Sequence, residues 1–367
     1  MVCSAVEELK GCDKVRNPFV RESGNYKTTY SDDMKMFGTT GAKIKALLIV
    51  LLVLSLPLFT SSYWIGLLTL CAIASVGAIG LNILTGFTGQ ISIGVGAFLG
   101  VGGYTSAILT STYGLSFWIS LPLAGIVTAL IGGLFGIPSL RLKGLYLAIA
   151  TLAAQVIILF VISRWDSLTG GTAGMVLSRP TIGQFSLSSN TGYYYLCVII
   201  LLFTVMYATN LIRTRTGRAF LAVRDRDIAA QIMGINLFKY KVMAFAISSF
   251  FVGIAGALLA HYTMIVSPEL YNFHVSIEYL AMILIGGLGS VFGSILGAVF
   301  ITLLPVSLGA LIDVMAGFMP DLYQLFSAFK DFIFGAVIIL FLIFEPGGLA
   351  HIWLNIKKYF RLWPFSY

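Results

Sequence analysis

Long apolar runs, each about as long as a bilayer-spanning helix, follow one another through most of this chain. A helix of about 20 apolar residues can cross the hydrocarbon core because it satisfies its own backbone hydrogen bonds there. The candidate spans are residues 44–61, 63–84, 90–110, 117–137, 144–163, 193–212, 242–262, 276–304 and 329–346. Only 10% of the 367 residues are charged, whereas soluble domains carry about 25%. The sequence therefore predicts an all-α polytopic membrane protein.

Two of the apolar regions contain glycine-rich interruptions. One lies at residues 86–90 (GFTGQ) and the other at 286–290 (GGLGS), in the middle of a region too long for one simple span. The segments ILTGFTG (83–89) and ILIGGLG (283–289) share a pattern, as an internal repeat would. Irregular backbone at membrane depth must be buried in protein or line a cavity. We therefore expect about 8–10 transmembrane helices, some broken or re-entrant at glycines.

The basic residues predict orientation, since cytoplasmic loops of membrane proteins are enriched in Lys and Arg. The net charge of +8 is concentrated in a few short segments. These are the tail before residue 46, Arg141 with Lys143, residues 213–241 and the end of the chain after 356. The loops 164–192 and 263–275 carry few or no basic residues and are expected outside. The charge therefore reports topology, and we expect contact with membrane lipid and none with nucleic acid.

The predicted organisation has three parts. Residues 1–43 form a polar N-terminal cytoplasmic tail, residues 44–350 a transmembrane domain, and residues 351–367 a cytoplasmic C-terminal tail. A conventional start, MKMFGTTGAKIKALLIV, begins at Met34, so translation is hypothesised to begin near that residue.

One long basic segment, residues 213–241, separates two predicted spans. Its basic residues are Arg213, Arg215, Arg218, Arg224, Arg226, Lys239 and Lys241, against Asp225 and Asp227. It also contains Ala229-Ala230-x-x-x-Gly234, expected to form a short amphipathic docking helix. Such a segment is typical of a membrane subunit moved by a separate motor. The chain has no G-x-x-x-x-G-K-[ST] phosphate loop, so an ATP-binding motor would be another chain.

Polar residues at membrane depth gather around the first glycine interruption. They are Asn82, Thr85, Thr88, Gln90 and Ser92. Two interpretations are open. They satisfy the free backbone groups of a broken helix, or they line a translocation path and hydrogen-bond a zwitterionic ligand.

Catalysis and resident cofactors are not expected. The histidines are isolated, and the cysteines Cys3, Cys12, Cys71 and Cys197 have no zinc or disulfide spacing. We predict no catalytic residue, no metal site and no cofactor, and therefore a protein that is not itself an enzyme.

Four stretches together resemble a known family. They are residues 81–109 (LNILTGFTGQISIGVGAFLGVGGYTSAIL), 140–153 (LRLKGLYLAIATLA) with 168–175 (LTGGTAGM), 217–258, and 276–300 (SIEYLAMILIGGLGSVFGSILGAVF). The ordered set is similar to the LivM-type permeases of branched-chain amino acid ABC importers. The resemblance implies a bacterial inner-membrane subunit with a LivH-like permease partner, LivG- and LivF-like ATPase subunits and a periplasmic amino acid-binding protein.

The resemblance also implies docking residues. ABC permeases carry E-A-A-x-x-x-G in the docking helix, where this chain has Ile228-Ala229-Ala230-x-x-x-Gly234, with Asp227 one place before the replaced Glu. The predicted ATPase-docking residues are Arg224, Asp225, Asp227, Ala229, Ala230 and Gly234.

Alternative functions remain open at this point. Some members of the same family import urea or short-chain amides, and the spans do not distinguish these cargoes. A different class, an ATP-independent channel or secondary transporter, would need no ATPase subunit. The spans contain no chain of buried Asp, Glu and His that could relay protons, which disfavours a proton-coupled pump.

Overall fold

The computed structural model describes residues 40–138, 142, 144–182, 185–186, 189–318, 323–345 and 347–362. The chain divides into two compact units, one ending at Thr60 and one beginning at Ser61. In the first unit the described element is helix α3 (Thr40–Phe59). Most of the predicted tail 1–43, the proposed start near Met34, and the basic pair Arg141 and Lys143 lie outside the described residues.

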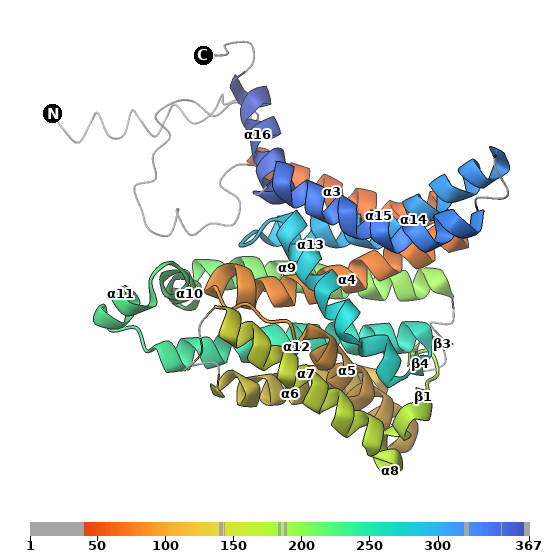
Figure 1. Cartoon of the computed structure of the whole chain (residues 1–367), viewed down its shortest axis with the longest axis horizontal. Coiled ribbons are helices and arrows are strands. Elements are labelled where there is room, and N and C mark those ends of the chain that lie inside the picture. The colour runs from red at the N-terminus through yellow and green to blue at the C-terminus, as the bar shows by residue number, and fades with distance from the viewer. Residues whose placement is uncertain are drawn as a thin grey trace. The chain divides into compact units, whose positions relative to one another are not determined.

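The second unit is built of helices, with two short two-stranded sheets at its loops (Figure 1). Its first half contains α4 (Ser62–Thr88), α5 (Val95–Ala107), η2 (Ile108–Thr112), α6 (Phe117–Gly136), α7 (Leu145–Arg164), α8 (Asp166–Thr169) and η4 (Gly171–Ala173). The second half contains α9 (Asn190–Arg213), α10 (Arg215–Asp225), α11 (Asp227–Ile232), α12 (Leu237–Thr263), η5 (Pro268–Tyr271), α13 (Phe273–Gly286), α14 (Val291–Phe318), α15 (Tyr323–Phe344) and α16 (Gly348–Leu362). Strand β1 (Met175–Val176) pairs antiparallel with β4 (Ile265–Val266), and β2 (Thr181–Ile182) with β3 (Phe185–Ser186).

Six helices among the described residues are long and apolar enough to cross a membrane. They are α4, α6, α7, α9, α12 and residues Val291–Ala310 of α14. This number is below the predicted 8–10. The predicted span 90–110 contains only the short α5, and the predicted region 276–304 is divided between the short α13 and α14. The predicted spans 44–61 and 329–346 contribute only the shorter apolar stretches Ala46–Phe59 and Phe332–Phe341. Helices α5 and α13 have 13 and 14 residues. At about 1.5 Å per residue each reaches only about 20 Å, short of the roughly 30 Å hydrocarbon core.

Helices α4 and α12 form the centre of the second unit. The apolar core joins them to α5, α6, α9, α13 and α14. Glycine permits close approach at several crossings. A Cβ on Gly102 of α5 would strike the backbone of Gly253 on α12, and one on Gly256 would strike that of Leu99. Small residues thus let these helix backbones meet, as is common in membrane bundles.

Helix α12 separates two different ends of the unit. Helices α10 and α11 precede its first residue, and the β1–β4 pair follows its last (Figure 1). With 27 residues it is about 40 Å long, enough to cross a bilayer. The predicted inner segment 213–241 and the predicted outer loops therefore lie at opposite ends of one membrane-length helix.

Candidate functional site

The docking segment, residues 213–241, folds into two helices between α9 and α12. Thr214 caps α10 by accepting the amide of Gly217 at 3.4 Å, and Asn236 caps α12 by accepting the amide of Lys239 at 3.1 Å. Side-chain caps of this kind satisfy amides that have no partner inside the helix. Polar residues of the segment therefore mark where α10 and α12 begin, while α11 begins after Arg226 without a side-chain cap.

Helix α10 packs against the other helices of the second unit, which we call the membrane unit. Its buried residues include Ala219, Phe220 and Val223. The Phe220 ring is only 1% exposed and belongs to an apolar cluster with Ile83 and Leu84 of α4. Burial of one phenylalanine stabilises such a contact by about 1.5–3 kcal/mol. The first half of the docking segment is thus attached to the C-terminal end of α4.

Helix α11 has the opposite character. Ile228, Ile232 and Met233 are 66%, 82% and 83% exposed, which leaves an apolar surface within a charged segment. Of the predicted alanine pair, Ala229 is exposed and Ala230 is buried. None of these three apolar residues was among the predicted docking residues. Ile232 follows Ile228 by four residues, a spacing that puts the two on one helix face, and Met233 directly follows the last residue of α11.

Gly234 and Asp227 bound this short helix. Gly234 has a φ of 86°, a backbone conformation that favours glycine. No atom lies within 4 Å of where its Cβ would be, so crowding does not explain the glycine. Asp227 is in the first turn of α11, where a carboxylate is favoured by the helix dipole.

Arg224 points toward the membrane unit. Its Nη1 donates to the carbonyl oxygen of Gly86 at 3.1 Å, and its Nε donates to Asp225 Oδ1 at 3.0 Å. Two residues predicted from sequence to contact an ATPase are therefore engaged with each other and with the end of α4.

The two glycine segments that share a sequence pattern meet in the structure. We call residues 86–89 and 286–290 the glycine crossing. Asn82, on α4, spans it: Nδ2 donates to Ser290 O at 2.9 Å and to Ser294 Oγ at 2.6 Å, and Oδ1 accepts the amide of Gly289 at 2.9 Å. A Cβ on Gly86 would strike Asn82 Oδ1 and the Gly289 amide. Gly287 and Gly289 have φ of 113° and 76°.

The other polar residues predicted for the path are all buried. Thr85 Oγ1 donates to Gln90 O at 3.2 Å and Thr88 Oγ1 to Ile83 O at 3.0 Å. Ser92 Oγ accepts the amide of Gly94 at 3.4 Å. These hydroxyls thus satisfy backbone groups where α4 ends. The Gln90 side chain differs, since neither of its amide atoms has a partner among the described residues.

Further polar contacts, which sequence reasoning did not select, hold the loop after α4. Thr151 Oγ1 on α7 accepts the amide of Ile93 at 2.9 Å. Ser276 Oγ accepts the amide of Gly96 at 2.8 Å and donates to Gln155 Oε1 at 2.7 Å. The loop between α4 and α5 is therefore tied to α7 and α13 as well as to the glycine crossing.

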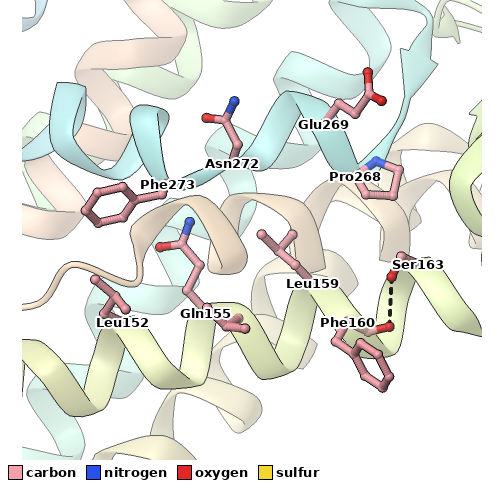
Figure 2. Close-up of a pocket in the computed structure, with 10 residues that line it drawn as sticks. Leu152, Gln155, Leu159, Phe160, Ser163, Pro268, Glu269, Asn272 and Phe273 are labelled. Atoms are coloured by element: carbon pink, nitrogen blue, oxygen red, sulfur yellow. Dashed lines mark hydrogen bonds between the residues drawn. The ribbon is translucent and has the colours of Figure 1, made fainter.

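A groove of about 670 Å³ opens between α7 and the segment of η5 and α13 (Figure 2). It is lined by Leu152, Gln155, Val156, Leu159, Phe160, Ser163, Pro268, Glu269, Asn272 and Phe273. Figure 2 shows Gln155 pointing from α7 toward the segment that carries Asn272. Its amide is engaged, since Oε1 accepts from Ser276 and Nε2 donates to Tyr271 O at 3.4 Å. No predicted path residue lines this groove.

No cluster of His, Cys, Asp or Glu suited to a metal ion occurs among the residues that the structure describes.

Comparison with known proteins gives a consistent result. The family described as "Branched-chain amino acid transport system / permease component" matches residues 63–342, most of the chain. No solved structure matches.

Individual relatives agree with the family match. The high-affinity branched-chain amino acid transport system permease protein LivM of Salmonella typhimurium is 34% identical over 84% of this chain and 75% of its own length. The probable branched-chain amino acid transport permease protein LivM of Methanocaldococcus jannaschii is 26% identical over 63% of this chain and 67% of its own. The ribose import permease protein RbsC of Haemophilus influenzae is 26% identical over 72% and 84%.

The membrane-length helices and these matches agree with one another. The chain is a multi-pass membrane protein and a transporter component, not an enzyme, and it belongs to the branched-chain amino acid transport system permease family.

Proposed function

We propose that this chain is a transmembrane subunit of an ABC importer in the bacterial inner membrane, and that it translocates branched-chain amino acids. A LivH-like permease would complete the translocation unit, LivG- and LivF-like ATPases would power it, and a periplasmic binding protein would deliver the amino acid. The observation that carries the proposal is the exposed apolar surface of α11, within a basic segment at one end of α12.

The physical argument concerns what covers that surface. Ile228, Ile232 and Met233 expose large apolar side chains beside Arg226 and Asp225, a setting too polar for the bilayer core. An apolar patch rimmed by charges is typical of a protein interface. The ATPase cleft is the occupant that we propose, because the position corresponds to the docking helix of ABC permeases.

Within this proposal the glycine crossing lies where α4 meets the docking segment, and the short helices α5 and α13 enter the membrane without crossing it alone. Together with α3 and α15 they would bring the number of membrane helices to about 8–10. Buried Gln90, whose amide atoms have no partner among the described residues, is our first candidate for a residue of the path.

The strongest alternative to the proposal concerns the cargo, since the relatives include a ribose import permease. Branched-chain amino acids are favoured by the family match and by the 34% identity to the LivM protein of Salmonella typhimurium, against 26% to the ribose permease. Uptake of labelled leucine, urea and ribose by the complete reconstituted importer separates the cargoes. Uptake of urea or ribose without leucine would overturn the amino acid assignment.

The docking proposal is tested with Ile232→Asp, which places a charge in the exposed apolar surface. We expect the ATPase subunits to be lost on copurification while the permease remains in the membrane. The matched control is Val176→Asp, an equally exposed apolar residue at the other end of α12. Full ATPase retention by Ile232→Asp, or equal loss in both variants, would contradict docking through α11.

A further inference from the structure

Arg224 fills a vacant hydrogen-bonding position at the end of α4. The last four carbonyl groups of a helix have no partner within it. The amide of Gln90, the natural partner of Gly86 O, donates instead to Leu84 O at 3.2 Å. Gly86 O accepts from Arg224 Nη1 at 3.1 Å. A positive charge at a helix C-terminus is also favoured by the helix dipole.

The same side chain touches both halves of the glycine crossing. A Cβ on Gly289 would lie 3.1 Å from Arg224 Nη1, and one on Gly89 would lie 2.9 Å from Arg224 Cγ. Gly89 has a φ of 72° and ends α4, so the chain leaves the helix next to the Arg224 side chain. Asn82 on α4 also binds the second half, through the Gly289 amide. A shift of Arg224 therefore acts on both turns together.

Arg224 is also adjacent to the exposed helix α11. Only Asp225 and Arg226 separate it from the first residue of α11. Arg226 is extended, with φ of −155° and ψ of 101°, so the chain changes direction there. Asp225 holds the guanidinium through Nε at 3.0 Å. A displacement of α11 would therefore move Arg224, and with it the hydrogen bond to the Gly86 carbonyl.

We infer that Arg224 is a positioning residue that couples displacement of α11 to the glycine crossing, and so to opening and closing of the permease. The inference rests on the proposed function, since it needs an ATPase that moves α11. It assigns Arg224 a role inside the membrane unit, in place of the contact with the ATPase that its place in the docking segment implied.

The test uses the complete importer in vesicles, with leucine uptake and phosphate release measured in the same preparation. The variants are Arg224→Gln, Arg224→Lys and the matched control Arg215→Gln. Arg215 is an exposed arginine at the start of α10, so its variant removes the same charge from the same helix.

We expect Arg224→Gln to keep its ATPase subunits and hydrolyse ATP, but to use about tenfold more ATP per leucine, within the range of about 5–150-fold typical of coupling between sites. Arg224→Lys keeps a charged donor and should recover much of the ratio, while Arg215→Gln should match the native protein. A purely structural role would lower both rates together and leave the ratio unchanged.

A second variant, Asp225→Ala, tests the same inference if Arg224→Gln fails to fold. Asp225 is 65% exposed, and its loss frees the guanidinium without touching Gly86. We expect the ATP-per-leucine ratio to rise in the same direction by a smaller factor.

Two outcomes overturn the coupling role while the importer assignment stands. One is an unchanged ratio in Arg224→Gln, and the other is loss of the ATPases from that variant. Leucine uptake by the native complex without nucleotide would instead overturn the importer assignment itself.

Discussion

Asn82 and the glycines around it are specified by contacts between residues far apart in sequence. The side-chain amide of Asn82 hydrogen-bonds to residues 289, 290 and 294. The amide oxygen of Asn82 lies where a Cβ on Gly86 would be. Position 86 must therefore lack a side chain, because the Asn82 amide oxygen fills the space beside it. At the residue scale the glycine crossing is therefore a mutually dependent set, and single substitutions within it should be costly.

Gly86→Ala should destabilise the protein, because its new methyl group would meet Asn82 Oδ1 and the Gly289 backbone. Overpacking of this kind costs about 1–3 kcal/mol. Gly133→Ala is the matched control, since its Cβ has 3.9 Å to the nearest atom in a helix interior. That variant should be neutral or gain up to about 1 kcal/mol. Thermal unfolding in detergent measures both; equal melting temperatures would contradict the crowding argument.

Asn82→Ala removes the hydrogen-bond acceptor of the Gly289 amide, whereas Ser294 Oγ and Ser290 O stay bonded to each other at 3.2 Å. Each buried polar group left without a hydrogen bond costs about 1–3 kcal/mol. Asn190→Ala provides the comparison, because the Asn190 amide makes an exposed bond to Ser62 Oγ at 2.9 Å. Its loss should change stability by no more than about 0.5 kcal/mol. The prediction fails if the two variants unfold at the same temperature.

At the scale of elements, the docking segment separates two tasks between neighbouring helices. Helix α10 buries Phe220 and Val223 against the membrane unit, whereas α11 exposes Ile232 and Met233. The chain turns between them at Arg226. A segment with one attached helix and one exposed helix can transmit a push, because the attached helix carries the displacement into the bundle.

Phe220→Ala should release α10 from α4 and speed trypsin cleavage after its exposed arginines in inside-out vesicles, because cleavage requires local unfolding of the helix. Truncating a buried phenylalanine costs about 3–5 kcal/mol, and about 1.4 kcal/mol is a factor of ten in population. We therefore expect cleavage within α10 to accelerate at least about tenfold. Phe238→Ala, at a half-exposed ring near the start of α12, should cleave at the native rate. Similar rates in both variants would show that Phe220 does not attach α10.

At the scale of the whole molecule, α12 determines which parts face different sides of the membrane. Its length of 27 residues matches a tilted membrane span, with α11 before it and β4 after it. Strand β1 pairs with β4, so the loop after α7 is held at the same end as the chain that follows α12.

Cysteine labelling tests this arrangement. In a background without the native cysteines, Val176→Cys should react with an impermeant maleimide in cells with an intact inner membrane. Ile232→Cys should react only after that membrane is opened. Both native side chains are highly exposed, so access depends on the side of the membrane and not on burial. Labelling of both positions from one side would contradict the orientation assigned from the basic segments.

How much could be predicted from the sequence depends on how far apart along the chain the interacting residues lie. Apolar runs of span length predict a helical membrane protein because the bilayer imposes the same requirement on every such run. The number of full-length spans was predicted less well. α5 and α13 are bounded by turns at residues 89–94 and 287–290, whose placement depends on partners elsewhere in the chain.

The docking segment shows the same division. Its basic composition predicted an inner segment, and Ala229, Ala230 and Gly234 predicted a short helix with a glycine end. That Ala230 is buried and that Arg224 binds Gly86 depended on contacts with distant parts of the chain. Local sequence therefore determined where the chain is apolar, where it is charged and where it turns. Only the tertiary structure decided which polar groups meet, because a hydrogen bond between distant residues such as Asn82 and Gly289 has no local signature.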